Sequence, residues 1–381
     1  MKKRLGDYIK EYSVRNKENQ DIPVYSVTNT EGFCQDYFGK EVASKDKSTY
    51  KIVPQGYFAY NPSRINVGSV DWQRTQERVI VSPLYNVFSV SDKLDQQYLY
   101  YYLKSDFALQ RIKAVATGSV RDNLKLKMLY EFPINIPELS SQKNIVELLD
   151  KIKKIEGLKK AELDYFDTLV KARFVEMFEK ESDQWHHKKL VECCDNKNDI
   201  KCGPFGSQLH VEDYQNIGVP VYGIPEVNSG FKSNPKLYIS QQKAEELSAY
   251  SLIDGDVAVS RKGNVGQAAL FYDSLKNGII HSDVLRVRLN KQIMDPFFLI
   301  GELHFSQSIR NQVKQASNGA IMPGINVTKL KQIVVDIPPL AIQKEFSGFI
   351  QQVEKSKVAI NRCTVIIGKA LQSEYHHVWG D

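Results

Sequence analysis

The stretch that decides the fold is INIPELSSQK, residues Ile134–Lys143, because a near copy, VDIPPLAIQK, occupies Val335–Lys344. The copies begin at positions 134 and 335, an offset of 201 in a chain of 381 residues. At this offset the match runs without a gap from Gly118–Lys180 onto Gly319–Asp381. Self-similarity at a fixed offset indicates a repeated architecture. The sequence therefore predicts two similar halves.

The repeat weakens upstream of these tails but persists. IPVYSVTNTEGF from Ile22 is similar to VPVYGIPEVNSGF from Val219, and NVG recurs at Asn66 and Asn264. Each half therefore consists of a long variable segment and a better-preserved tail, and the chain length also favours more than one domain. We expect two globular domains and the tail that follows each of them, in the order 1–137, 138–183, 184–337 and 338–381.

Both tails carry the apolar pattern of long helices. Apolar residues recur there at spacings of three and four, which is typical of a heptad seam. Lys159 and Glu162 interrupt the first seam. Each helix would run about 40 residues, or roughly 60 Å. We predict that the two pack together as a coiled coil; two unrelated amphipathic helices on separate cores are the alternative. The predicted seam residues are Ile145, Leu148, Ile152, Ile155, Phe166 and Leu169 in the first tail and Phe346, Phe349, Val353, Ile360 and Ile367 in the second.

The variable segments mix strand and helix patterns. DVAVS from Asp256 and DVLRVRL from Asp283 are typical of strands. YLYYYLKSDFALQRI from Tyr98 and FFLIGELHFSQSIRNQV from Phe297 are each typical of one amphipathic helix, and the tyrosine-rich face is assigned to the core. The predicted fold class is therefore α/β (α+β): two similar globular domains separated by two long antiparallel helices, with pseudo-two-fold symmetry.

Composition limits the classes of function. A net charge of +6 permits a polyanionic partner without requiring one. No apolar run approaches the ~18 residues of a membrane span. Five cysteines without a secretion signal favour a reduced, cytoplasmic protein. The sequence offers no phosphate-binding glycine pattern, no nucleophile–base arrangement and no metal-ligand spacing. We therefore expect a chain that is not an enzyme and binds no metal.

The motifs of the second half stand in a characteristic order. They are KCGPFGSQLHVEDYQNIGVPVYGIPEVNSGF from Lys201, YISQQKAEEL from Tyr238, LIDGDVAVSRKGNVGQAAL from Leu252 and IPPLAIQKEF from Ile337. In this order they resemble the target-recognition domain and conserved helix of type I restriction–modification specificity subunits. The first half is similar through PVYSVTNTEGF, YFAYNPSRINVGS and IPELSSQKNI, but it lacks a GPFGS segment. The resemblance covers essentially the whole chain.

This resemblance implies a non-catalytic subunit in which each domain reads one half of a split double-stranded DNA target. The helices would set the spacing and dock two methyltransferase subunits, and restriction/translocase subunits would complete the complex. S-adenosylmethionine, ATP and magnesium would belong to those partners, with no cofactor in this chain. A protein-interaction scaffold that assembles through its coiled coil without reading DNA is the alternative.

Base reading requires polar side chains on loops that reach a DNA groove. We predict such contacts in turn-rich, glycine-flanked stretches of both halves, with Arg261 as the first choice. The candidates are Asn61, Ser63, Arg64, Asn66, Arg74 and Arg121 in the first domain, and Ser207, Gln208, His210, Arg261, Lys262, Asn264 and Asn318 in the second.

Overall fold

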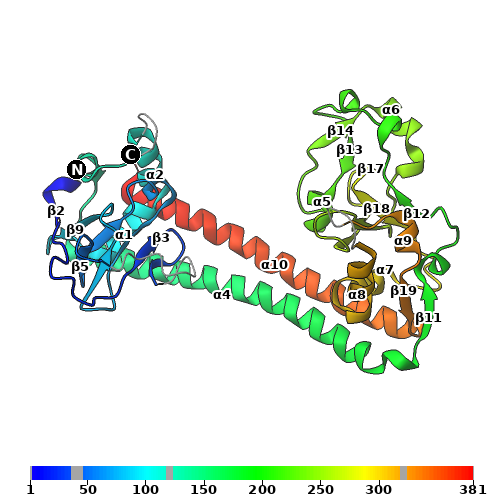
Figure 1. Ribbon diagram of the computed structural model, residues 1–381. Coiled ribbons are helices and arrows are strands. Elements are labelled where there is room, and N and C mark those ends of the chain that lie inside the picture. The colour runs from blue at the N-terminus through cyan, green and yellow to red at the C-terminus, as the bar shows by residue number, and fades with distance from the viewer. Residues whose placement is uncertain (1, 36–45, 117–122, 318–323, 381) are drawn as a thin grey trace. The chain divides into compact units, whose positions relative to one another are not determined.

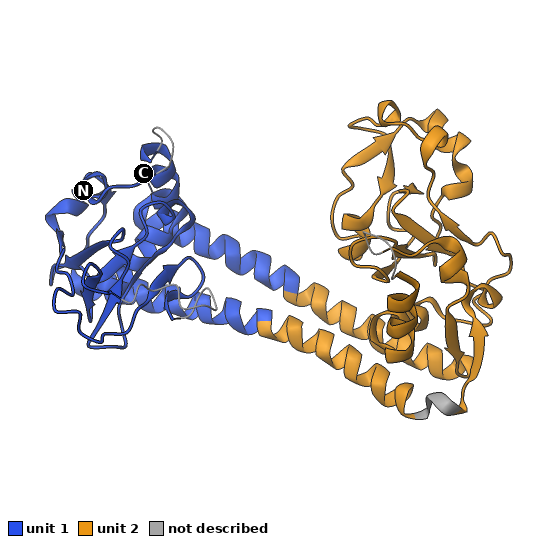
Figure 2. Cartoon of the chain, viewed as in Figure 1, with its two compact units in different colours: residues 1–160, 361–381 blue, residues 161–360 orange. Residues whose placement is uncertain are grey.

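The computed structural model describes residues 2–35, 46–116, 123–317 and 324–380 (Figure 1). It divides into two compact units, which Figure 2 distinguishes by colour. Unit 1 comprises residues 1–160 and 361–381, and unit 2 comprises residues 161–360. Each unit thus combines one globular domain with parts of both long helices.

The globular domain of unit 1 is followed by the first long helix, which continues into unit 2. Its elements are β1 (Lys3–Arg4), β2 (Ile9–Glu11), β3 (Ser26–Thr28), β4 (Gly32–Cys34), β5 (Lys51–Pro54), β6 (Phe58–Tyr60), β7 (Val70–Trp72), β8 (Arg78–Val81), β9 (Asn86–Val90), α1 (Gln96–Lys104), α2 (Asp106–Val115), α3 (Leu126–Leu129), β10 (Pro133–Ile134) and α4 (Leu139–Met177).

The globular domain of unit 2 is followed by the second long helix, which continues into unit 1. Its elements are β11 (His186–Lys189), β12 (Ile200–Cys202), β13 (Val219–Tyr222), α5 (Ile224–Asn228), β14 (Leu237–Ile239), α6 (Gln241–Glu246), β15 (Val257–Ser260), β16 (Ala268–Leu270), β17 (Ile279–Ile280), β18 (Val284–Val287), α7 (Pro296–Phe305), α8 (Gln307–Ser317), α9 (Val327–Lys331), β19 (Val334–Ile337) and α10 (Leu340–Trp379).

Both domains contain the same antiparallel four-stranded sheet. Its strand order is β2-β9-β6-β7 in unit 1 and β12-β18-β15-β16 in unit 2. In β15, Val257 and Val259 enter one core cluster and Ala258 enters another, because successive side chains of a strand point to opposite faces. A short pair also precedes each long helix, β1 with β10 and β11 with β19. The mixed α/β repeat expected from the sequence is confirmed.

The helical segment after each sheet was predicted as one helix, and this is wrong. The structure has α1 and α2 in unit 1, divided at Ser105, and α7 and α8 in unit 2, divided at Ser306. Ser105 has an extended backbone, and its hydroxyl accepts a hydrogen bond from the N–H of Ala108. The Ser306 hydroxyl accepts from the N–H of Ile309 in the same way. Serine caps of this kind begin a new helix.

The long helices α4 and α10 contain 39 and 40 residues, which confirms the predicted length. In unit 1 the first part of α4 shares a core with the last part of α10, and in unit 2 the last part of α4 shares a core with the first part of α10. The helices therefore pack antiparallel within each unit, side by side as in Figure 1. Arg173 of α4 pairs with Glu345 of α10 at 2.8 Å.

The buried stripe of α4 departs from the predicted seam. Leu148 and Ile155 are each 43% exposed, whereas Leu149 is fully buried. The stripe shifts because this part of α4 faces the first domain as well as α10, and Asp150 accepts a hydrogen bond from the hydroxyl of Tyr101 in α1. The other seam candidates are half-buried at Ile145, Ile152, Phe166, Leu169, Phe349 and Ile367, and buried at Phe346, Val353 and Ile360.

A buried glutamine joins each globular domain to the start of its long helix. Gln142 and Gln343 occupy equivalent places in the repeat, and both are fully buried. Each amide oxygen accepts one backbone N–H from the turn before α1 or α7, at 2.8 Å, and each amide nitrogen donates to two backbone carbonyls. The backbone partners are Lys93, Asp95 and Pro137 in unit 1, and Ile293, Asp295 and Pro338 in unit 2.

Candidate nucleic-acid interface

The hairpin loop between β15 and β16 presents three of the predicted DNA-contacting residues, Arg261, Lys262 and Asn264. The loop turns through Gly263 and Gly266, whose φ angles of 66° and 90° favour glycine. Lys262 and Asn264 are exposed on this turn. The hairpin therefore holds one cationic and one amide side chain at the end of a rigid sheet.

Arg261 stands at the base of this loop and is fixed by several contacts. Its backbone N–H donates to the carbonyl of Asp283 at 2.9 Å, and its carbonyl accepts from the N–H of Ile325 at 3.0 Å. Its guanidinium donates to the carbonyl of Ser282 at 3.2 Å and to the sulfur of Cys202 at 3.4 Å. Burial raises the pKa of the Cys202 thiol, so the sulfur beside Arg261 stays neutral. Arg261 is thus a positioned, half-buried positive charge.

Lys262 forms an ion pair with Asp283, which directly precedes β18. Its ammonium lies 2.8 Å from a carboxylate oxygen of Asp283, and the two side chains are 49% and 28% exposed. Exposed pairs of this kind contribute little to stability. The lysine can exchange this partner for a phosphate, because the ion pair costs little to open.

The hairpin loop between β6 and β7 is the counterpart in unit 1. Asn61 accepts hydrogen bonds through its side-chain oxygen from the N–H and the hydroxyl of Ser63, at 3.1 and 2.9 Å. Arg64 is exposed beside this turn, and Asn66 is half-buried. Gly68 ends the loop with a φ of 88°. Four predicted residues therefore gather on one loop.

In each unit, a second and equivalent segment of the chain hydrogen-bonds to the hairpin loop. In unit 1 the N–H of Leu124 donates to the carbonyl of Pro62 at 3.1 Å, and in unit 2 the N–H of Ile325 donates to the carbonyl of Arg261. These segments follow α2 and α8, respectively. The two candidates from these segments, Arg121 and Asn318, lie outside the described residues.

The remaining candidates of the second domain follow β12. Ser207, Gln208 and His210 are all exposed. This segment begins at Cys202, whose sulfur contacts Arg261, so it adjoins the β15–β16 hairpin. Because β12 and β15 are both antiparallel to β18, both predicted clusters of unit 2 follow strands that finish at the same end of the sheet.

Arg74 lies apart from the unit 1 loop, beyond the other end of β7. Its guanidinium carbon is 4.5 Å from the ring centroid of Trp72 and 5.2 Å from that of Tyr100. One guanidinium nitrogen also donates to the carboxylate of Asp71 at 2.7 Å. These partners hold the Arg74 guanidinium against β7 and α1.

Sequence patterns gave no indication of Lys104, which supports the unit 1 loop. Its ammonium donates to the carbonyls of Gly68 and Asn29 and lies 5.5 Å from the ring centroid of Tyr100. Burial lowers the pKa of this lysine. A lysine at a helix end is ordinary in sequence, and only the tertiary contact with Gly68 reveals its role.

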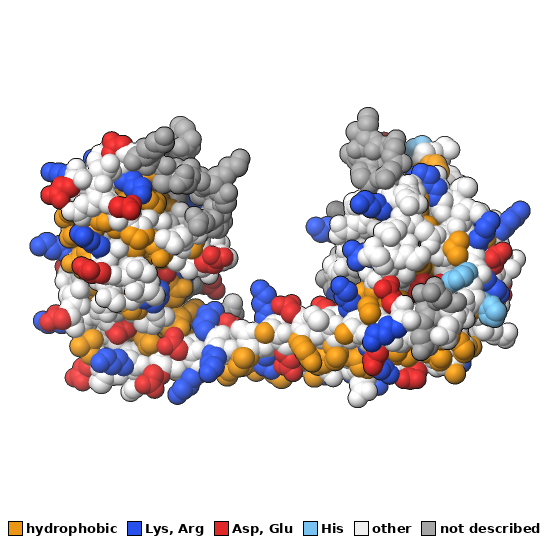
Figure 3. All heavy atoms as spheres, turned by 60° about the horizontal axis from the view of Figure 1, so that its bottom comes forward, with side chains coloured by type: hydrophobic (Ala, Val, Ile, Leu, Met, Phe, Trp, Pro, Cys, Tyr) orange, Lys and Arg blue, Asp and Glu red, His pale blue; other side chains and the backbone are white. Residues whose placement is uncertain are grey.

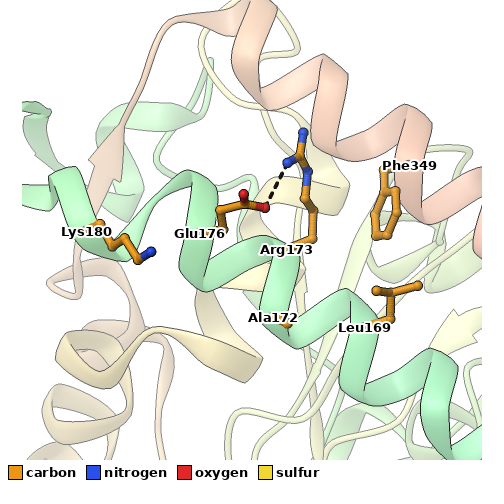
Figure 4. A pocket seen from close by; sticks show the side chains of 6 residues that line it. All are labelled: Leu169, Ala172, Arg173, Glu176, Lys180 and Phe349. Atoms are coloured by element: carbon orange, nitrogen blue, oxygen red, sulfur yellow. Dashed lines mark hydrogen bonds and ion pairs between the residues drawn. The ribbon is translucent and has the colours of Figure 1, made fainter.

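The long helices carry apolar residues outside their mutual contact. In unit 1, Leu158 of α4 is 61% exposed, and Val365 and Ile366 of α10 are 58% and 66% exposed. We call these three residues the outer apolar face. Figure 3 shows apolar side chains interspersed with charged ones along the helices. In unit 2, Tyr165 of α4 is 63% exposed, and a separate depression of about 500 Å³ is lined by Leu169, Ala172, Arg173, Glu176, Lys180 and Phe349 (Figure 4).

Across residues 2–35, 46–116, 123–317 and 324–380, no helix is both long and apolar enough to cross a membrane. In that same part of the chain, no three or more His, Cys, Asp or Glu side chains are grouped so that they could hold a metal ion.

Comparison with known families matches residues 3–165 and 183–367 to a family model described as the type I restriction modification DNA specificity domain. A specificity subunit named MjaX from Methanocaldococcus jannaschii is 29% identical over 161 residues, 40% of this chain and 37% of that protein. The EcoKI specificity subunit of Escherichia coli K12 is 23% identical over 74% of this chain and 66% of that protein. The chain thus spans less than two thirds of the length of either relative.

Solved structures show a similar fold over nearly the whole chain. A chain from work on complex assembly and conformational transition of the type I R-M system has a TM-score of 0.62 at 16% identity, with 99% of this chain and 97% of that chain covered. The type I restriction-modification S subunit from M. genitalium has a TM-score of 0.56 at 14% identity, with coverages of 100% and 96%.

Proposed function

This chain belongs to the type I restriction modification DNA specificity family, and we propose that each globular domain reads one half of a bipartite target in double-stranded DNA. The observation that carries this proposal is the repeated interface. Each domain has a polar hairpin loop at the same end of the same sheet, approached by the segment that follows its second helix. Sequence is read by side chains that reach base edges in a groove, and these loops present such side chains.

The residues of the two interfaces suit different parts of this task. Lys262 and Arg64 are exposed cations, which suit phosphate contacts that supply salt-dependent affinity. Arg261 is held by backbone and sulfur contacts, which suits a side chain that must meet one base edge in a fixed direction. The two loops differ in sequence, so the two half-sites would differ.

The long helices would act as the spacer and as the docking site for partners. An antiparallel pair is compatible with a pseudo-two-fold arrangement of the two readers, which would match the two-fold axes of duplex DNA. The outer apolar face would bind two methyltransferase subunits, and restriction/translocase subunits would complete the complex. In this proposal the chain itself is non-catalytic, and S-adenosylmethionine, ATP and magnesium are bound by the partners.

Single substitutions in the two loops test this proposal. Arg261→Ala is expected to relax recognition of the second half-site only, and Arg64→Ala should affect the domain 1 half-site or weaken binding there. The measurement is a map of modified bases in a host that expresses each variant with its methyltransferase partner. Arg310→Ala, which removes an exposed arginine of α8, is the control and should leave the map unchanged.

The alternative scaffold function makes the opposite prediction. A scaffold that does not read DNA would leave the map unchanged in Arg261→Ala and Arg64→Ala. The DNA-reading function, by contrast, predicts that a gel-shift of the complex over a range of salt concentrations shows weaker DNA binding for Arg64→Ala, with a smaller dependence on salt. If the complex binds no DNA, or both variants retain the full map, the reading function is wrong.

A further inference from the structure

The loop Phe205–Gln208 in unit 2 is built to project from the domain. Before it, Gly203 is packed so closely that a Cβ would lie 2.3 Å from the carbonyl oxygen of His281. After it, Leu209 is only 8% exposed and belongs to a core cluster with Ile239. Both ends of the loop are therefore fixed, while its four residues are all exposed.

A tyrosine holds the last side chain of this loop. The hydroxyl of Tyr250 donates to the amide oxygen of Gln208 at 3.0 Å. Tyr250 is itself secured by core contacts and by Lys201, whose ammonium lies 5.3 Å from the tyrosine ring centroid. With its oxygen held in this way, the amide of Gln208 has a fixed direction. Its nitrogen remains a donor, and its oxygen keeps a second lone pair.

Phe205 supplies an apolar group on the same turn. It is 61% exposed, and its carbonyl accepts a hydrogen bond from the N–H of Gln208 at 3.4 Å. Exposure of a phenyl ring to water is unfavourable in free energy, and contact with an apolar surface would remove part of this ring from water. The loop therefore presents an amide and an apolar ring three residues apart.

We propose that this loop reads an A·T base pair of the second half-site in the major groove, with Gln208 as the reading residue, Phe205 as the apolar contact and Tyr250 as the positioning residue. This inference rests on the proposed DNA-reading function. In the major groove, adenine presents N7 as an acceptor and N6 as a donor, which a glutamine amide pairs with through two hydrogen bonds. The paired thymine presents a methyl group, which an apolar side chain contacts.

Protein variants test the roles of the three residues. Gln208→Ala and Tyr250→Phe in the complete complex should both lose discrimination at one and the same A·T position, by roughly 5- to 100-fold. Phe205→Ala should reduce discrimination at that position or at the adjacent one. The readout is the methylation rate on a library of sites that varies each base pair. Gln307→Ala is the matched control, because this exposed glutamine instead pairs with Asn311 on α8.

Modified bases then test the contacts directly. With 7-deazaadenine at that position, methylation by the wild-type complex should slow. The methylation rate of the Gln208→Ala complex should not fall any further on this modified DNA. With uracil in place of thymine, the wild-type complex should slow and Phe205→Ala should not. Tyr250→Phe should unfold at the same temperature as the wild type and should still recognise the first half-site. These two results would show that the variant loses the positioning of Gln208 and not its fold.

Three results would overturn the inference. They are a second half-site without an A·T pair at the affected position, unchanged discrimination in Gln208→Ala, and equal sensitivity of the wild type and Gln208→Ala to 7-deazaadenine. A wild-type complex that methylates no bipartite site would instead contradict the proposed function itself.

Discussion

At the scale of single residues, unit 2 contains two side chains, Glu302 and His304, whose pKa values are shifted by burial. Glu302 of α7 is only 2% exposed, and one of its carboxylate oxygens has no hydrogen-bond partner among the described residues. Burial, with Asp336 and Glu179 nearby, raises the pKa of Glu302 to about 8. Burial lowers the pKa of His304 to about 4, and its ring accepts the N–H of Ala268. Both side chains are therefore neutral at neutral pH.

Glu302 makes the stability of unit 2 depend on pH. Its pKa is raised in the folded state, so its contribution is fully present below the unfolded pKa of 4.5 and is lost as pH rises through about 8. Within that window the free energy of unfolding should fall by about 1.4 kcal/mol for each pH unit. Glu302→Gln should remove this slope in urea unfolding, measured as the difference from the wild type, whereas Glu212→Gln, on the exposed surface, should retain it. Parallel curves for Glu302→Gln and the wild type would refute this assignment.

Sequence analysis succeeded for residues whose role is local. DVAVS from Asp256 was predicted as a strand, and β15 indeed begins at Val257, directly after a turn in which Gly255 has a φ of 86°. Asp256 is buried and pairs with Arg288 through two hydrogen bonds of 2.8 Å. That pairing, like the contact of Lys104 with Gly68, joins segments distant in sequence. No local pattern records such partners.

At the scale of elements, the repeated motif forms the junction between each domain and its long helix. The motif glutamines Gln142 and Gln343 are fully buried, and each makes hydrogen bonds to three backbone groups. The sequence indicated the heptad period of the helices but not the face of α4 that is buried. That face depends on Tyr101 and its neighbours in the globular domain, which a helix pattern alone does not include.

Removal of either motif glutamine should loosen its own domain from its own helix. Gln343→Ala leaves the N–H of Asp295 without its buried acceptor, which should cost about 1–3 kcal/mol. Hydrogen exchange at Asp295 should accelerate while exchange at Asp95 is unchanged, and Gln142→Ala should give the reverse. Ser141→Ala, at an exposed neighbouring position, is the control. Equal acceleration at both sites in either variant would contradict the separate junctions.

The outer apolar face should determine the affinity for the methyltransferase partner. Leu158→Lys should weaken association with that subunit at least 10-fold, because a charge would have to be desolvated against an apolar surface. The free energy of unfolding of Leu158→Lys should hardly differ from that of the wild type, because Leu158 is 61% exposed. The affinity can be measured by titration calorimetry with Lys154→Ala, an exposed residue of the same helix, as the control. Wild-type affinity in Leu158→Lys would exclude this face as the docking surface.

At the scale of the whole molecule, the duplication explains why two globular domains of different sequence share one architecture. Each half repeats the four-stranded sheet, the divided helix pair, the glutamine junction and a long helix, whereas the additional strands and the loops at the end of the sheet differ. The duplication and the two long helices were predictable from the sequence through the offset of 201 residues and the helix period, whereas the divided helix pair was not. The contacts of each interface loop depend on tertiary neighbours and required the structure.

We propose that the paired helices set the distance between the two DNA-reading domains. The most direct test is deletion of the equivalent middle heptads, residues 156–162 and 357–363, in the same chain. Seven residues correspond to about 10.5 Å of helix, or about three base pairs of DNA, and the deletion preserves the heptad period. Modified-base mapping of the complex should show both half-sites unchanged and a gap shortened by about three base pairs. An active complex with its original gap, or with altered half-site bases, would contradict the account.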